Sequence, residues 1–339
     1  MATYIRTYAP GFGLLVAAGV LAVATASLSP LVNALVVAVC IGAVLGNLVD
    51  IPEQFEAGIG LRRLFLETGI VLLGVSVALA ELLTAGPRLL AIVLGTVAFG
   101  LVVVESIGRV VFGLTDELPS LLAAGSSICG VSAVVAIGRV IGARDGPLAL
   151  AAGTVLFFDA VTLVLFPIVG RALSLSSVEF GVWAGLSMFS TGPVAAAGFA
   201  YSPEAGQWAT VTKLVRNSLL GLVAIGYSIV AVRLRHTVGT GTKTRATDPS
   251  VTRLWRDFPK FLVGFVLLAV VANTGVLTAS SIEAIGTVTD WLFVLAFVGL
   301  GTTIQLSTMR DAGGTPVAIV LVYLVIIAGV SLVAVMALF

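Results

Sequence analysis

Apolar runs of about twenty residues recur from one end of the chain to the other, and this feature limits the possible folds most strongly. Each run is long enough to cross the roughly 30 Å hydrocarbon layer of a bilayer as a helix. Charged residues make up only 10% of the chain, whereas soluble domains carry about 25%. The sequence therefore predicts an all-α polytopic membrane protein, with residues 1–339 in a single transmembrane domain.

Eleven of these runs are predicted to cross the membrane. They cover residues 10–27, 30–49, 65–83, 88–112, 119–141, 147–170, 178–201, 205–232, 258–275, 287–306 and 315–338. If the loops alternate sides, one face holds only Arg88, Arg139 and Arg144, and most loop Lys and Arg residues share the face of the N-terminus. Because positive loops stay in the cytoplasm, we expect a cytoplasmic N-terminus, an outside C-terminus and a flexible cytoplasmic loop at residues 233–257.

Glycine spacing predicts inverted repeats, arranged as one extra helix plus five plus five with broken crossing helices. Gly74 stands twelve residues before Gly86, and Gly301 stands twelve before Gly313. A second pairing matches residues 119–141 with the tenth crossing, which contains the segment GLGTT. We favour the second pairing, because it places an interruption rich in glycine and hydroxyl groups in both halves.

The segment GSSICGVSAVVAIG, residues 125–138, is a poor membrane helix although it lies inside an apolar run. It combines helix-loosening glycines with small polar groups, and irregular backbone at bilayer depth is tolerated only in a protein interior or beside a wet cavity. The pattern predicts a broken helix that forms a solute site, with Ser126, Ser127, Cys129 and Gly130 as candidate ligands. The alternative is a close-packed helix interface of small residues.

A second interruption is predicted in GVWAGLSMFSTGPVAAAG, residues 181–198. Pro193 breaks the helical hydrogen-bond ladder, and Ser187, Ser190 and Thr191 supply hydroxyl groups just before it. Freed amides and hydroxyls suit an oxyanion. The alternative is a proline kink in an ordinary packing helix.

Lys213 and Arg216 lie inside the eighth crossing, three residues apart and so on one helical face. Each costs about 2.5–3.5 kcal/mol if it faces lipid at the bilayer centre. An anionic solute or a buried carboxylate would offset that cost. The alternative is that both side chains extend along the helix to the membrane surface.

Asp159 stands alone in the middle of the sixth crossing, in TVLFFDAVTLVLF. Intramembrane acids are rare and mark ion pathways and proton relays, so Asp159 is a candidate carrier of a coupling proton. The alternative is a static ion pair with Lys213 or Arg216.

The sequence offers little for enzymatic chemistry. It contains no phosphate loop, HExxH motif or Ser/His/Asp pattern, and its two cysteines, Cys40 and Cys129, both lie in apolar segments. We therefore expect no enzyme activity, no cofactor, no metal and no nucleic-acid partner.

Three segments, GSSICGVSAVVAIG, GVWAGLSMFSTGPVAAAG and KLVR, resemble in order and spacing the YeiH-type family of proposed sulfate exporters. GIVLLG near Gly74, FPKFLVGFVLLAVVANTG from Phe258 and GLGTTI near Gly301 fit the same pattern, so the resemblance covers nearly the whole chain. It implies a fold related to bile-acid symporters and cation/proton antiporters, with a panel domain and a core domain. It also implies sulfate as the solute. Panel-to-panel dimers of related folds favour a homodimer.

The chain departs from the family pattern at one point. Where the family has a His-Asp pair followed by Thr and, two residues later, Gln, this chain has Phe189, Ser190, Thr191 and Pro193. Both titratable groups of the pair are missing. We therefore hypothesise that Asp159 has taken over proton coupling.

Together these features predict a multi-pass cell-membrane transporter for a small anion such as sulfate or an organosulfur anion. The bilayer and the anionic solute are its expected partners. Alternatives are a cation/proton antiporter centred on Asp159 and a non-transporting membrane sensor or scaffold. The candidate substrate-binding residues are Ser126, Ser127, Cys129, Gly130, Ser190, Thr191, Lys213, Arg216, Thr302 and Thr303.

Overall fold

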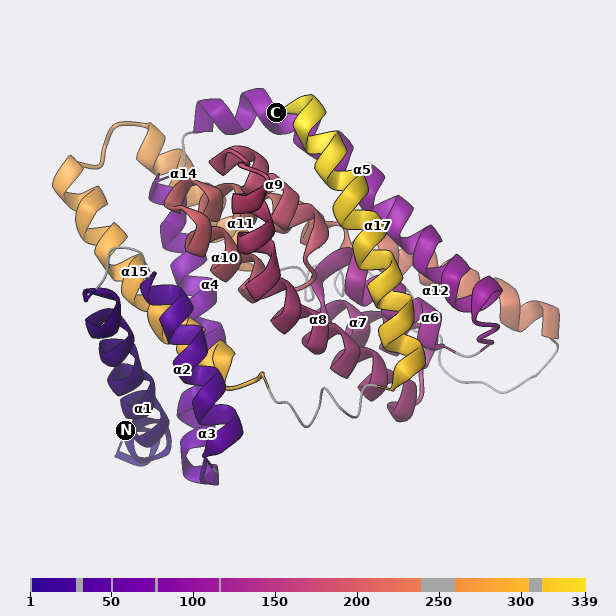
Figure 1. Cartoon of the computed structure of the whole chain (residues 1–339), viewed down its shortest axis with the longest axis horizontal. Helices are drawn as coiled ribbons and strands as arrows, with labels where there is room; N and C mark the ends of the chain where they lie inside the picture. Colours follow the sequence, from indigo (N-terminus) through magenta and orange to yellow (C-terminus); the bar gives the residue numbers. More distant parts are fainter. Residues whose placement is uncertain are drawn as a thin grey trace.

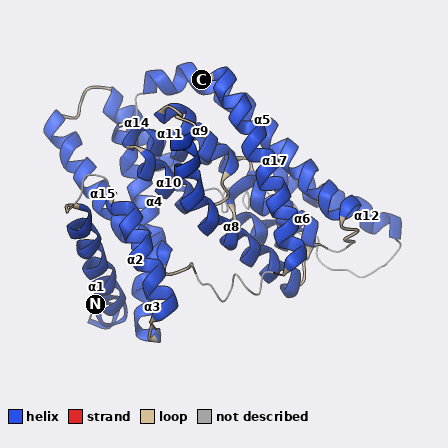
Figure 2. Ribbon diagram, viewed as in Figure 1, coloured by secondary structure: helices blue, strands red, loops and turns tan. Residues whose placement is uncertain are grey.

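The computed structural model confirms the all-helical prediction (Figure 2). It describes residues 2–28, 33–49, 51–76, 79–115, 117–238, 260–304 and 313–339, and these residues contain no strand. Within these ranges, six helices are long and apolar enough to span a bilayer singly, and the other apolar helices are shorter. Four of the shorter helices form two hairpins, described below, and these hairpins lower the number of crossings from the eleven that were predicted.

The helices form two bundles (Figure 1). The panel bundle, at the left of Figure 1, consists of α1 (Ala2–Ala26), α2 (Ala34–Leu48), α3 (Glu53–Gly60), α4 (Arg62–Leu73) with the short turn η1 (Gly74–Ser76), α14 (Lys260–Asn273) and α15 (Ala279–Gly301). The core bundle consists of α5 (Leu79–Ser106) with η2 (Ile107–Val111), α6 (Leu118–Ala124), η3 (Gly125–Cys129), α7 (Val131–Ile141), α8 (Asp145–Ala172), α9 (Ser177–Ser187), α10 (Thr191–Tyr201), α11 (Pro203–Ser218), α12 (Leu220–Val238) and α17 (Gly314–Leu338). The bundles meet where α10 packs against α2 and α15. We name the two bundles after the panel and core domains that the family resemblance implies.

In the panel bundle, glycines of the tenth predicted crossing serve close packing and do not interrupt the helix. The α15 helix continues through Gly301, which lies against Gly42 of α2. A Cβ on either glycine would overlap a backbone carbonyl oxygen of the other helix. The pairing of residues 119–141 with this segment as two matched interruptions was therefore wrong, and inverted repeats remain a prediction.

The fifth predicted crossing is a hairpin that turns back inside the membrane. We call α6, η3 and α7 the first hairpin. Its two ends lie together, because Arg144 Nη2 donates to Glu117 Oε2 at 3.1 Å. Halfway along the arms, a Cβ on Gly138 would lie 3.4 Å from Leu121 Cδ2. The chain therefore returns to the side from which it entered, and the prediction that residues 119–141 cross the membrane was wrong.

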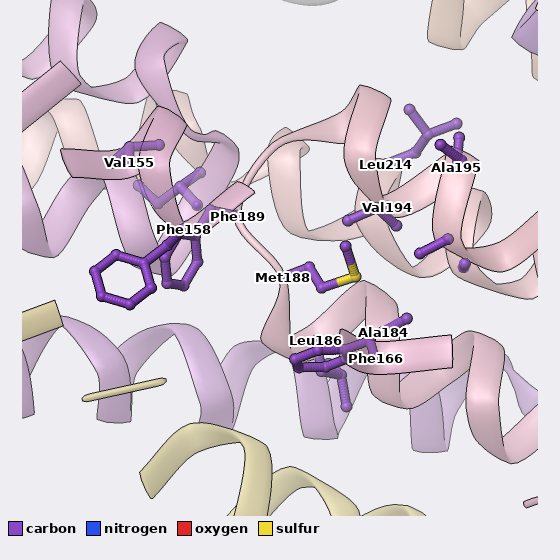
Figure 3. Packing of buried hydrophobic residues seen from close by; sticks show 14 of the residues in the cluster. Val155, Phe158, Phe166, Ala184, Leu186, Met188, Phe189, Val194, Ala195 and Leu214 are labelled. Atoms are coloured by element: carbon purple, nitrogen blue, oxygen red, sulfur yellow. The ribbon is translucent and has the colours of Figure 1, made fainter. Parts of the chain in front are cut away.

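The seventh predicted crossing has the same form. We call α9, α10 and the three residues between them the second hairpin. Ser177 Oγ and Ser202 Oγ, at its two ends, are 2.9 Å apart. The rings of Phe180 and Tyr201 stack with centroids 4.0 Å apart. Figure 3 shows Met188 on the extended link that separates the two half-helices. The predicted break is confirmed, but this segment does not cross the membrane either.

The arms of both hairpins are half as long as a membrane span. The arms α7, α9 and α10 each contain 11 residues, or about 16 Å at 1.5 Å per residue, against roughly 30 Å of hydrocarbon. The 28-residue helix α8 joins the end of the first hairpin to the start of the second. Because α8 is long and apolar enough to cross the whole bilayer, we infer that the hairpins enter from opposite sides and that their tips meet near its centre.

The hairpins change the sides on which the charged loops lie. Removing two of the eleven predicted crossings leaves an odd number, so the termini are still expected on opposite sides. However, Arg139 and Arg144 move to the side of Arg109, and Arg171 moves to the opposite side. This rearrangement strengthens the positive-inside asymmetry, because the side with Arg109 gains two positive charges and loses one. A cytoplasmic N-terminus therefore remains the prediction.

We predict a labelling pattern that distinguishes hairpins from crossings. In a variant in which Cys40 and Cys129 are replaced by serine, single cysteines at Arg109, Arg144 and Arg171 are treated with a membrane-impermeant maleimide. Cysteines at 109 and 144 should react from one face, and a cysteine at 171 from the other. Permeabilised membranes provide the control for reactivity. If the cysteine at 144 reacts from the face opposite to the cysteine at 109, the first hairpin is a crossing.

Two predicted boundaries also change. The third crossing, placed at residues 65–83, ends with η1, and α5 begins at Leu79 and continues through Pro87. The predicted loop at residues 233–257 begins inside α12, which extends to Val238. Residues 239–257 of that loop lie outside the described part of the chain.

Candidate functional site

The tips of the two hairpins are in contact at Gly130 and Ser190. Gly130 has φ 72° and ψ −142°, a conformation close to a region that is almost exclusive to glycine. A Cβ at this position would overlap Ser190 Oγ. Gly130 is therefore required both to reverse the chain and to let the second hairpin approach. The structure thus brings together two predicted site residues from segments far apart in the sequence.

Arg216 caps the carbonyl ends of both hairpins. It donates to the carbonyl oxygens of Ser127 at 2.6 Å, Leu186 at 2.6 Å and Met188 at 2.8 Å, and also to that of Ser126. The last carbonyls of a helix lack intrahelical partners and carry partial negative charge. The guanidinium therefore neutralises the first arm of each hairpin where that arm ends inside the membrane.

Lys213 supports the same two ends. Its Nζ donates to the carbonyl oxygens of Ile128 at 2.6 Å and Met188 at 3.2 Å. The side chains do not reach the membrane surface, since Lys213 is 0% exposed and Arg216 is 1% exposed. The structure therefore gives both cations a role at helix ends, and direct contact with an anion stays a prediction.

The second arms begin at the same place with their amide ends. Neither α7, which follows Gly130, nor α10, which follows Ser190, has a side-chain cap at its N-terminus. The first amides of a helix lack intrahelical partners and attract anions. Thr191, in the first turn of α10, is partly exposed, and its Oγ1 is hydrogen-bonded to the Asn217 amide at 2.9 Å. The amide end of α10 thus lies beside a partly exposed residue.

Pro193 belongs to the start of a half-helix. It lies in the first turn of α10, three residues after the N-cap Ser190. Proline is tolerated there, because the first amides have no partner within the helix. The kink that the sequence allowed as an alternative is therefore not formed, and the interruption precedes Pro193.

Asp159 belongs to the middle of α8, and its side chain lies against the start of α10. Its Oδ1 accepts a hydrogen bond from the Ser190 amide at 3.0 Å. The residue is 3% exposed, and its Oδ2 has no hydrogen-bond partner among the described residues. Within the same residues no direct ion pair joins Asp159 to Lys213 or Arg216. The static ion pair considered as an alternative is therefore not formed.

The hydroxyls of Ser126 and Ser127 are used inside the protein. Both residues are 0% exposed. Ser126 Oγ donates to the Leu122 carbonyl at 2.7 Å, and Ser127 Oγ donates to Tyr323 Oη at 3.4 Å. Cys129, next to Gly130 at the tip, is partly exposed. Of the first hairpin's four candidates, Cys129 alone is partly exposed, and a solute contact for each of them stays a prediction.

Thr302 and Thr303 lie at the end of α15 in the panel bundle. Their hydroxyls donate to the carbonyls of Gly299 at 2.8 Å and Leu300 at 2.7 Å. Leu300 approaches the core, because a Cβ on Gly192 of α10 would lie 3.3 Å from its Cδ1. The panel therefore reaches the second hairpin through Leu300, and no described contact brings the two threonines to the tips.

Tyr323 of α17 belongs to the site although no sequence motif singled it out. This tyrosine is 0% exposed, and its ring stacks with that of Phe189 at a centroid distance of 6.3 Å. Its hydroxyl lies against Ser127 of the first hairpin. A tyrosine inside an apolar 25-residue helix was the available signal, because a buried phenol needs a hydrogen-bond partner. Tyr323 therefore contacts both hairpins near their tips.

A groove of about 910 Å³ lies beside the entry of the first hairpin and does not include the tips. At its polar end Glu105 accepts hydrogen bonds from Arg109 at 2.6 Å, Ser120 at 2.6 Å and Tyr227 at 3.0 Å. This cluster ties the first hairpin to α5 and α12. The tips carry the more specific chemistry, since they combine helix ends, two buried cations and a buried acid.

Comparison with known proteins gives one family. The family model described as conserved hypothetical protein 698 matches residues 10–320. A UPF0324 membrane protein of Nitratidesulfovibrio vulgaris is 31% identical over 82% of this chain and 76% of its own length. A second UPF0324 membrane protein, from Bradyrhizobium diazoefficiens, is 30% identical over 89% and 84%.

The UPF0324 inner membrane protein YeiH of Escherichia coli is 29% identical over 86% of this chain and 81% of its own length. These names place the relatives in a membrane and state no solute. No solved structure matches the chain.

Proposed function

The chain belongs to the family of conserved hypothetical protein 698 and is similar to the UPF0324 inner membrane protein YeiH, and we propose that it is a secondary transporter of a small anion. One observation carries the proposal. Two hairpins of half-membrane length meet at their tips, and the amide ends of their second arms lie beside the partly exposed residues Cys129, Ser190 and Thr191. Secondary transporters build solute sites from such discontinuous helices.

The charges around the tips favour an anion. The carbonyl ends that would bind a cation are already occupied by Lys213 and Arg216. The amide ends carry partial positive charge and attract negative groups, as the hydrogen bond from the Ser190 amide to Asp159 illustrates. Sulfate or an organosulfur anion is the proposed solute, as the resemblance implies, and export is its implied direction.

Asp159 is the proposed site of the coupling proton. Its carboxylate bonds the amide of Ser190, the position at which the family pattern carries the acid of its His-Asp pair. The acid of the family pattern, at position 190, and Asp159 of α8 would thus place a carboxylate at the same point, the start of α10. Movement of the core bundle against the panel bundle is the proposed route to alternating access.

A cation/proton antiporter is the second candidate, because Asp159 Oδ2 is buried without a hydrogen-bond partner among the described residues. The two buried cations near Asp159 weigh against it, since they would repel a bound metal cation.

Flux of labelled sulfate into proteoliposomes tests the proposal. We expect uptake that unlabelled sulfate competes for, and loss of its dependence on a pH gradient in Asp159→Asn. Labelled sodium provides the parallel assay. Sodium flux without sulfate flux would favour the antiporter, and no flux of any solute would favour a sensor or scaffold.

A further inference from the structure

Asp159 occupies the amide end that an anion would use. The Ser190 amide, which begins α10, donates to Asp159 Oδ1 at 3.0 Å. A helix N-terminus is a natural site for one negative charge, and in this structure the protein's own carboxylate takes that place. The other carboxylate oxygen, Oδ2, is buried and has no hydrogen-bond partner among the described residues. The carboxylate can therefore accept a proton on Oδ2 while Oδ1 keeps its hydrogen bond.

An ionised Asp159 and a bound anion exclude each other. Two negative charges at one buried site repel strongly, and one of them must be neutralised before both can stay. The positive charges near Asp159 are Lys213 and Arg216 of α11, and the ionisable groups Cys129 of η3 and Tyr323 of α17 lie beside these cations. Both cations already serve helix carbonyls. A proton on Asp159 is the simplest means of admitting a second negative group.

We infer that one proton and one small oxyanion bind together at the hairpin tips, the proton on Asp159 and the anion on the amide ends of α7 and α10. This inference rests on the proposed function and adds the relative direction in which the proton and the anion move. Because proton and anion bind as a pair, they cross the membrane in the same direction. An inward proton gradient would then drive uptake of the anion, opposite to the export that the resemblance implies.

Binding measurements on the purified full-length protein test the inference. Sulfate, sulfite, phosphate and chloride are each titrated over a pH series, with thermal stabilisation as the readout of affinity. Where Asp159 is ionised, affinity for the bound anion should rise about tenfold for each unit by which pH falls, because linkage requires one proton per anion. In weakly buffered solution, one proton should be taken up for each anion bound.

Two variants complete the test. Asp159→Asn resembles the protonated residue, so it should bind the anion with an affinity that does not change with pH and take up no proton. Asp145→Asn, at the exposed start of the same helix, should behave as the unsubstituted protein. The inference is overturned if the unsubstituted protein binds the anion with an affinity that does not change with pH, or if Asp159→Asn takes up as many protons as the unsubstituted protein. Absence of binding by all four anions would overturn it as well.

Failure of this inference and failure of the proposed function are distinguishable. Paired binding of proton and anion without any flux in proteoliposomes would support the inference and remove the transporter. Flux without proton uptake would retain the transporter and remove the coupling.

Discussion

Arg216→Met should lower the free energy of unfolding by about 3–5 kcal/mol, the usual cost of breaking a buried charge interaction from one side. The methionine side chain fills part of the space but donates no hydrogen bond. The carbonyls of Ser127, Leu186 and Met188 would then remain buried without this donor. Each buried polar group left unsatisfied costs about 1–3 kcal/mol, so the two hairpins should separate at their tips.

Unfolding by SDS in mixed micelles measures this loss. Arg139→Met is the matched control, because Arg139 is exposed at the end of α7 and such substitutions usually change stability by less than about 0.5 kcal/mol. Arg216→Lys keeps the positive charge but has fewer hydrogen-bond donors, so its loss of stability should lie between those of Arg139→Met and Arg216→Met. This variant can still be measured if Arg216→Met does not fold. Equal stability of the Arg139→Met and Arg216→Met proteins would show that the guanidinium does not hold the hairpins.

Gly130→Ala should be the most damaging small substitution at the tips. Forcing alanine into this backbone conformation costs about 1–3 kcal/mol, and overpacking against Ser190 typically adds about 1–3 kcal/mol. The added methyl would also push apart the residues that present the amide ends to the solute. We therefore expect loss of anion binding in the thermal-stabilisation assay, together with reduced stability.

Gly113→Ala separates the cost of backbone strain from the cost of overpacking. Gly113 also has a positive φ, 65°, but a Cβ there would meet no atom within 4 Å. It should lose only about 1–2 kcal/mol and keep anion binding. Ser190→Gly in the Gly130→Ala background removes the overlapping side chain and should restore part of the stability. Identical losses in Gly113→Ala and Gly130→Ala would mean that tip contact is unimportant.

The positions of the two interruptions could be predicted from the sequence. Gly125 to Gly138 and the segment around Ser190 were recognised because small polar residues and glycine are poor choices for a lipid-facing helix. The importance of Lys213, Arg216 and Asp159 followed from the cost of charge in a bilayer. These predictions depend on local composition, which a single segment carries by itself.

The path of the chain through those interruptions could not be predicted. A segment of 23 residues, such as 119–141, has the right length for one crossing, and it also has the right length for two half-membrane arms. Hydropathy measures apolar length and cannot distinguish these arrangements. The contact of Leu121 with Gly138 and the pairing of Arg144 with Glu117 decide the matter, and both are tertiary.

Sequence alone determined that this chain enters a membrane, where its helices loosen and which charged residues lie at bilayer depth, because each of these follows from the transfer of side chains and backbone out of water. Only the tertiary structure decided how the charges are used. Lys213 and Arg216 lie within reach of two carbonyl ends, and Asp159 lies within reach of an amide end. Such assignments depend on which helix ends meet in space, and no local pattern specifies that.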